Sequence, residues 1–168
     1  MLIAAVETTD LIQRTAWLAR EIWMEHYIPI IGRPQVEYML DRFQSADAIQ
    51  EQLKTGYRYY LVCLNPDAAV GYFAVVPRHP DLFLSKFYIS PSYRGQGYGR
   101  QVFLYIEELA RTFQCTRISL NVNKQNSVSI AIYQKMGFRI LEDIVQDIGN
   151  GFVMDDYRMA KMVDAGGV

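Results

Sequence analysis

One short segment, from Ser90 to Gln101, places three glycines and two arginines within twelve residues. It reads SPSYRGQGYGRQ, and it separates an apolar run from a segment with helical periodicity. Glycines let a turn bring its backbone amides close to a ligand, since no Cβ stands in the way. Amides at the start of a helix have no partner within the helix and carry the positive end of its dipole. With Arg94 and Arg100 beside them, they predict a site for a pyrophosphate.

Two nucleotide-binding fingerprints fail on this segment. No G-x-x-x-x-G-K-[ST] pattern follows Gly95, which excludes a P-loop. A dinucleotide fingerprint would need a third glycine where Arg100 stands. The pattern that remains is Arg94-x-x-Gly97-x-Gly99 between a predicted strand and a predicted helix. The alternative reading is a turn that needs glycine only for its conformation, with its arginines in water.

A tyrosine further along the chain could carry proton chemistry. Val128, Ala131, Ile132 and Met136 recur at helical spacing and predict an apolar stripe. Tyr133 lies just off this stripe, so its hydroxyl could face a cleft. The alternative is an amphipathic tyrosine that borders the core.

The elements that would position these residues follow from periodicity and turn signals. Alternating aromatic and β-branched runs predict strands at 2–6, 57–64, 69–76, 82–89, 117–122, 138–148 and 151–163. Helical spacing predicts helices from about 8 to 25, from 34 to 43 with an extension to 53, from 97 to 113 and from 127 to 136. Gly137 would end the last helix. The fold class is therefore α/β, with a mixed seven-stranded sheet and helices on its faces.

The segment Arg94-Gly95-Gln96-Gly97-Tyr98-Gly99 resembles the [QR]-x-x-G-x-[GA] motif of the GCN5-related N-acetyltransferases (GNAT). A second segment, LNVNKQNSVSIAIYQKMGF, is similar to that family's fifth strand and the helix after it. The order of elements also matches over nearly the whole chain. The resemblance implies a three-layer GNAT-like fold, in which the fourth and fifth strands are parallel and splay apart.

The resemblance also implies the roles of individual residues. Acetyl-CoA would be the cosubstrate, and no metal would be needed. The backbone N–H of Ile89 would meet the acetyl carbonyl, and Tyr133 would act as general acid toward the CoA thiolate. Asn126 would bond pantetheine, although it could equally cap the helix that follows. The residues expected to contact the cofactor are Phe87, Tyr88, Ile89, Arg94, Gly95, Gln96, Gly97, Tyr98, Gly99, Arg100, Asn126, Ser129, Tyr133 and Lys135. We also expect strand pairing to stop near Ser90, because Pro91 cannot donate a ladder hydrogen bond.

The general base is left open by the sequence. Many family members place a glutamate in the fourth strand, whereas residues 82–87 hold no carboxylate. Two groups of residues could lie on the acceptor side, namely Glu25-His26-Tyr27 and the pair Asp155-Asp156. Only one of the two aspartates can face the cleft, since neighbouring residues of a strand face opposite ways. A base that acts through water is a further option.

The expected acceptor is the primary amine of a small molecule, which would attack acetyl-CoA directly in a ternary complex. Carboxylates near the cleft would favour a cationic amine, on which Trp23, Tyr27 and Tyr38 could stack. Two alternatives remain: a protein amine as acceptor, and a module that binds acyl-CoA without catalysis.

Composition limits the number of domains, the classes of partner and the cellular location that are expected. The chain has 168 residues, 51% of them hydrophobic, and a formal net charge of −1. This predicts one globular domain over 1–163 with a frayed tail at 164–168, and it argues against nucleic acid or an acidic membrane as partner. Cys63 and Cys115 form no C-x-x-C pair and suit a reducing compartment as buried residues. The N-terminus lacks the pattern of a leader, so the expected location is cytoplasmic. A homodimer is compatible with the aromatic strands.

Overall fold

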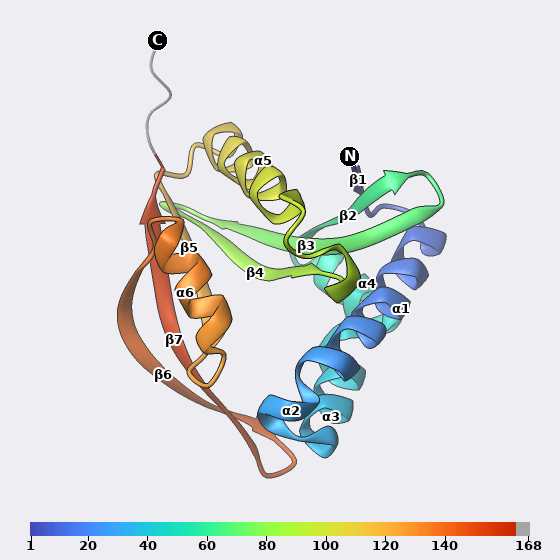
Figure 1. Ribbon diagram of the computed structural model, residues 1–168, viewed down its shortest axis with the longest axis vertical. Helices are drawn as coiled ribbons and strands as arrows, with labels where there is room; N and C mark the ends of the chain where they lie inside the picture. The colour runs from blue at the N-terminus through green and yellow to red at the C-terminus, as the bar shows by residue number, and fades with distance from the viewer. Residues whose placement is uncertain (164–168) are drawn as a thin grey trace. The chain divides into compact units, whose positions relative to one another are not determined.

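Seven strands form the single sheet of the computed structural model, which describes residues 1–163 (Figure 1). The strands are β1 (Leu2–Ala5), β2 (Arg58–Asn65), β3 (Ala68–Arg78), β4 (Asp81–Ile89), β5 (Arg117–Asn123), β6 (Arg139–Gly149) and β7 (Phe152–Met162). The helices are α1 (Thr9–His26), α2 (Ile28–Ile31), α3 (Arg33–Gln44), α4 (Ala46–Lys54), the 3-10 turn η1 (Pro91–Tyr93), α5 (Tyr98–Thr112) and α6 (Ser127–Lys135). The order across the sheet is β1-β2-β3-β4-β5-β7-β6. The α/β fold class with a mixed sheet is thereby confirmed.

The chain's internal contacts divide into two compact units, which are described separately. The first unit comprises Met1–Val76 and Lys86–Ile106, and the second comprises Pro77–Ser85 and Glu107–Val168. The predicted frayed tail, 164–168, lies outside the described residues. Among the residues that are described, no helix is long and apolar enough to cross a membrane.

The N-terminal helices follow from local capping chemistry. Thr8 caps α1, because its hydroxyl accepts a hydrogen bond from the Leu11 amide at 3.3 Å. Ser45 caps α4 in the same way through the Ala48 amide. The short helix α2 was not predicted, since its four residues carry no periodic signal; Gly32, at φ 83°, ends it.

The core of the first unit is built by α1, α4 and the β-meander. Residues such as Ile22, Ile49, Leu61 and Tyr72 are fully buried in one cluster. Cys63 belongs to the same cluster as a free buried thiol, as predicted. This core fixes the end of α1 and the end of β4, which carry several of the predicted site residues.

The second unit is organised around β5, β6 and β7. β5 is antiparallel to β7, and β7 is antiparallel to β6, with the turn of the long β6–β7 hairpin at Gly149–Gly151 (Figure 1). β5 also runs parallel to β4, over the three pairs that begin at Asp81–Arg117 and end at Phe83–Ser119. The predicted parallel pair is therefore present.

The predicted apolar stripe of α6 is wrong. Val128 is 67% exposed and Ile132 is 49% exposed, and Ala131 is exposed as well. The half-buried residues of the helix are instead Ser129, Ile130 and Tyr133. The stripe was drawn from residue type alone, and a short helix with apolar residues all round does not reveal which side packs.

A buried lysine is the main departure from an apolar core in the first unit. Lys86 is 7% exposed, and its Nζ donates to Gln52 Oε1 at 2.9 Å. The Nζ also lies 5.3 Å from the Tyr57 ring centroid and 5.2 Å from that of Tyr59. The Tyr59 hydroxyl donates to the same Gln52 oxygen at 2.6 Å. Burial lowers the pKa of Lys86 to about 7, because the charged form is poorly solvated there.

We predict that Lys86 makes the fold more stable at alkaline pH. Between pH 7 and 10 the unfolded chain would carry a proton that the folded chain has lost, so stability rises with pH in that window. In urea unfolding, the wild-type free energy of unfolding should rise by about 1 kcal/mol per pH unit relative to Lys86→Met. The exposed Lys54→Met serves as control and should leave the pH dependence unchanged. Parallel curves for wild type and Lys86→Met would contradict the prediction.

Candidate functional site

The predicted pyrophosphate turn joins η1 to α5 in the first unit. Gly95 and Gly97 adopt φ angles of 75° and 83°, a region that favours glycine. A Cβ built on either residue would meet no atom within 4 Å, so both glycines border open space. The Gln101 amide donates to Gly97 O at 3.2 Å, and the helix is therefore closed from this point. The backbone N–H groups of Tyr98, Gly99 and Arg100, in the first turn of this helix, have no acceptor within the helix. Their geometry would allow them to donate to a bound anion.

Arg94 holds this turn against the end of β4. Its Nε donates to Ile89 O at 2.9 Å, and its Nη1 lies 3.4 Å from His26 Nδ1. Gln96 fastens the turn a second time, because its side-chain amide donates to Ser92 O at 3.1 Å. Arg94 therefore shapes the turn as well as adding charge to it, and both Arg94 and Arg100 are exposed.

The end of α1 brings His26 to the same arginine. Burial, and then the positive charge of Arg94, lower the pKa of His26 below its ordinary value of 6.5, while Glu25 opposes the shift. His26 is accordingly a neutral imidazole at pH 7. Glu25 is exposed. The structure thus brings His26, predicted as an acceptor-side residue, into contact with Arg94, predicted as a cofactor residue.

Aromatic rings continue from His26 along the end of β4. The Tyr27 ring centroid lies 4.4 Å from Trp23 and 6.1 Å from Tyr88, and Tyr88 lies 5.6 Å from Trp23. Tyr38, also predicted to stack on an amine, instead accepts a hydrogen bond from Arg42 at 2.8 Å. Of the three predicted aromatic residues, Trp23 and Tyr27 are therefore together, and Tyr88 joins them.

The pairing of β4 explains why its last residues are distinctive. The Ser90 amide donates to Val70 O at 2.8 Å, so β4 stays hydrogen-bonded on the β3 side up to Ser90 as predicted. A Cβ on Gly71 would lie 2.5 Å from Tyr88 O, and glycine is therefore required for this close approach. On the β5 side, however, the ladder ends at Phe83. The expectation that strand pairing stops near Ser90 therefore fits the β3 side and is wrong for the β5 side, since Pro91 removes only its own donor.

The remaining predicted cofactor residues belong to α6 in the second unit. Asn126 is 3% exposed, and its Oδ1 accepts a hydrogen bond from the Ser129 amide at 3.3 Å. The capping role that was weighed for Asn126 is therefore present. Tyr133 is half-buried with its ring centroid 5.5 Å from that of Phe138, and Lys135 is exposed. That Tyr133 and the turn at Gly95–Gly99 contact the same cofactor stays a prediction.

The two aspartates of β7 have opposite environments. Asp155 is exposed, and its carboxylate lies 2.7 Å from Lys124 Nζ. Asp156 is 5% exposed. Burial raises the pKa of Asp156 to about 6, Asp155 adds to the rise, and Lys124 opposes it. Of the two, Asp156 therefore has the protonation behaviour of a base that works near neutral pH.

Sequence reasoning missed two polar strand residues, Lys86 and Asn121. Lys86 occupies the parity of Leu82 and Leu84, the buried face of β4. Asn121, on β5, has a buried Oδ1 that receives no hydrogen bond from residues 1–163. Strand alternation could have identified Lys86, whereas Asn121 alternates with the buried Leu120 and Val122 as an ordinary polar strand residue would.

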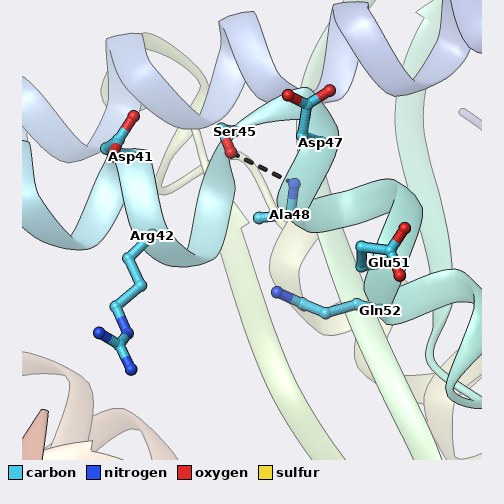
Figure 2. A pocket seen from close by; sticks show the side chains of 7 residues that line it. All are labelled: Asp41, Arg42, Ser45, Asp47, Ala48, Glu51 and Gln52. Atoms are coloured by element: carbon cyan, nitrogen blue, oxygen red, sulfur yellow. Dashed lines mark hydrogen bonds between the residues drawn. The ribbon is translucent and has the colours of Figure 1, made fainter.

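An open pocket of the first unit lies elsewhere. Figure 2 shows its lining, which comes from α3, α4 and their junction: Asp41, Arg42, Ser45, Asp47, Ala48, Glu51 and Gln52. None of these residues was predicted to bind cofactor or acceptor. Gln52 links this lining to the buried Lys86.

Comparison with known proteins agrees with this arrangement. The acetyltransferase (GNAT) family matches residues 18–138. The peptidyl-lysine N-acetyltransferase YjaB of Salmonella typhimurium is 26% identical over 125 residues, which cover 65% of this chain and 80% of that protein. The spermine/spermidine N(1)-acetyltransferase of Bacillus subtilis is 34% identical over 59 residues, covering 34% of this chain and 39% of that one.

A solved structure gives the same fold. The PaiA N-acetyltransferase of Thermoplasma acidophilum, crystallised in complex with coenzyme A, has a TM-score of 0.76 at 20% identity, covering 96% of this chain and 99% of that one. The family match alone spans well over half of the chain. The protein therefore belongs to the acetyltransferase (GNAT) family and is an N-acetyltransferase.

Proposed function

We propose that this protein transfers the acetyl group of acetyl-CoA to the primary amine of a small molecule by direct attack. The observation that carries the proposal is the turn before α5. Its two glycines have positive φ and border open space, and it precedes a helix of 15 residues. Such a turn suits the pyrophosphate of a CoA thioester.

Several residues would hold the donor. The amides from Gly95 to Arg100 would bond the pyrophosphate, and Arg100 would add charge from an exposed position. Arg94 would act mainly by fixing the turn, since its Nε is bonded to Ile89 O. The last residues of β4, namely Phe87, Tyr88 and Ile89, would lie along pantetheine. A relative of the same fold crystallised with coenzyme A supports this use of the fold.

The chemistry requires few protein groups. A neutral amine nitrogen attacks the thioester carbonyl, the C–N bond forms, and the C–S bond breaks. The Ile89 amide would stabilise the negative charge on the carbonyl oxygen. Tyr133 would give its hydroxyl proton to the departing thiolate. Asn126 would support Tyr133 by capping its helix through the Ser129 amide.

A small amine as acceptor rests on two observations. Trp23, Tyr27 and Tyr88 form an aromatic group beside the end of β4, and such rings favour a cation. A relative is a spermine/spermidine acetyltransferase. A protein lysine is the second candidate, because the peptidyl-lysine acetyltransferase YjaB is similar over a longer part of the chain.

We predict that the purified protein releases CoA thiol from acetyl-CoA in the presence of a small alkylamine. The panel would contain spermidine, putrescine, lysine ethyl ester, a lysyl peptide, an N-terminal alanyl peptide and aniline. Release with spermidine or putrescine at a kcat/KM at least about tenfold above that for the peptides supports a small-molecule acceptor. A preference for either peptide would overturn that part of the proposal. No release with any amine would overturn the whole.

We predict that Gly97→Ala weakens acetyl-CoA binding about tenfold, as measured by calorimetry. Alanine at a positive φ is strained by about 1–2 kcal/mol, so the turn should leave the conformation that presents its amides. Gly56→Ala is the matched control, since Gly56 also has a positive φ and open surroundings. Equal affinity in wild type and Gly97→Ala would remove the turn from the donor site.

We predict that Tyr133→Phe lowers kcat about 100-fold and changes the acetyl-CoA dissociation constant less than twofold. The change removes one hydroxyl and keeps the ring that packs on Phe138. Tyr105→Phe, on α5, controls for the loss of a tyrosine hydroxyl elsewhere. An undiminished kcat would exclude Tyr133 as the acid.

A further inference from the structure

The register of β5 and β7 places a row of polar residues on one face of the second unit's sheet. Asn123 pairs with Asp156, and Asn121 pairs with Arg158. Residues directly opposite in an antiparallel ladder share a face, and so do residues two apart along a strand. Asn121, Asn123, Asp156 and Arg158 therefore project from the same face, with Asn121 and Asp156 as diagonal neighbours about 7 Å apart.

The other face of this sheet carries the helices. Lys161 lies on β7 at the opposite parity to Asp156, and its Nζ forms an ion pair with Glu107 of α5. A Cβ on Gly137, just after α6, would also contact the Lys161 side chain. Glu107 and the end of α6, both in the second unit, thus lie on the Lys161 side. Tyr133, on α6, and Asp156 consequently approach the sheet from opposite faces.

Two hydrogen-bond acceptors on the Asp156 face have no partner within residues 1–163. Asp156 is 5% exposed, and neither a hydrogen bond nor an ion pair from those residues reaches its carboxylate. The Oδ1 of Asn121 is buried and equally unsatisfied. A largely buried carboxylate without a protein hydrogen bond is stabilised by a ligand that donates to it. Both groups can only accept, so the ligand that fits them is a donor.

The charges around Asp156 select a cation. Arg158 on the same face is neutralised by Glu142 of β6, whose Oε1 lies 2.9 Å from its Nη1. Ile144 of β6 and Asn123 of β5, which stand opposite Asp156, are uncharged. On the other face Lys124 is shared by Asp143 and Asp155. Asp156 is therefore a carboxylate of this face that no ion pair neutralises among the described residues, while Arg139, opposite Ala160, is exposed at another position of the same face.

We propose that Asp156 and Asn121 form the subsite for a cationic primary alkylamine, in which Asp156 takes the proton that the ammonium group must lose. Asn121 Oδ1 accepts a hydrogen bond from a second N–H or O–H of the same acceptor. This subsite rests on the proposed acetyl transfer, and it supplies the general base that the fourth strand lacks.

The proton balance of the step is complete. The bound ammonium passes one proton to the Asp156 carboxylate and becomes a neutral amine. The amine attacks the thioester, its C–N bond forms as the C–S bond breaks, and the nitrogen loses a second proton. The thiolate gains one proton from Tyr133. The second proton lost by the nitrogen then reprotonates Tyr133. Asp156 returns its proton to water, so one proton is released for each acetyl group transferred.

The test compares Asp156→Asn with Asp143→Asn, a carboxylate on the opposite face of the same sheet. With the alkylamine turned over fastest, kcat/KM should fall about 100-fold in Asp156→Asn and less than twofold in Asp143→Asn. With aniline, which is neutral at pH 7, the loss should be below about fivefold. The wild-type kcat/KM should decline on the acid side near pH 6, and this limb should vanish in Asp156→Asn.

Spermidine binding, measured by calorimetry with CoA present and absent, gives a readout without turnover. It should weaken at least tenfold in Asp156→Asn and in Asn121→Leu. If Asp156→Asn fails to fold, Asp156→Ser replaces it. Spermidine affinity within twofold of wild type, or a loss of rate in Asp155→Asn but not Asp156→Asn, would overturn the subsite. A wild type that binds spermidine but releases no thiol with any amine would instead overturn the proposed function and support the subsite.

Discussion

The alternation of side chains along β5 and β7 is the constraint on which the chemistry of the second unit depends. Asp155 and Asp156 are neighbours in sequence, yet a strand must send them to opposite faces. One therefore meets Lys124 at 2.7 Å, and the other is buried with no partner among the described residues. Shifting the β5–β7 register by one residue would exchange the two roles. The antiparallel ladder thus decides which carboxylate can act.

Both units keep one ionisable group in a place that disfavours its charge. Burial lowers the pKa of Lys86 to about 7 and raises that of Asp156 to about 6. For Asp156 the folded chain binds more protons than the unfolded one between about pH 4 and 6, so stability falls as pH rises through that window. For Lys86 the sign is the reverse, at higher pH. Near pH 6–7 both groups are partly charged, and the fold carries both penalties together. Lys86 offsets its penalty through Gln52 and two aromatic rings, whereas for Asp156 the charge of Lys124 offsets part of the penalty.

Much of this fold could be predicted from the sequence, because helix caps and turns depend on only a few neighbouring residues. Thr8 caps α1 and the glycine turn precedes α5, each through chemistry confined to a few residues. The α6 stripe failed because Val128 and Ile132 are apolar and yet exposed, and only packing determines which side of a short helix is covered. The end of the β4–β5 ladder at Phe83 was also misplaced, since Pro91 controls its own residue and not the partner strand. Tertiary pairing, rather than composition, fixed both outcomes.

The contrast between local signals and tertiary pairing also applies to the two substrates, the acyl donor and the amine acceptor. The proposed donor side uses backbone amides exposed by glycines. Such a site leaves a motif in the sequence, because the positive φ angles that it needs favour glycine. The proposed acceptor side uses the side chains of Asn121 and Asp156, which lie on different strands and meet only through their register. Many polar residues could bind an amine from these positions on the strands. The sequence of such a site therefore need not contain a recognisable motif. This physical difference explains why the sequence identified the acyl donor and left the amine open.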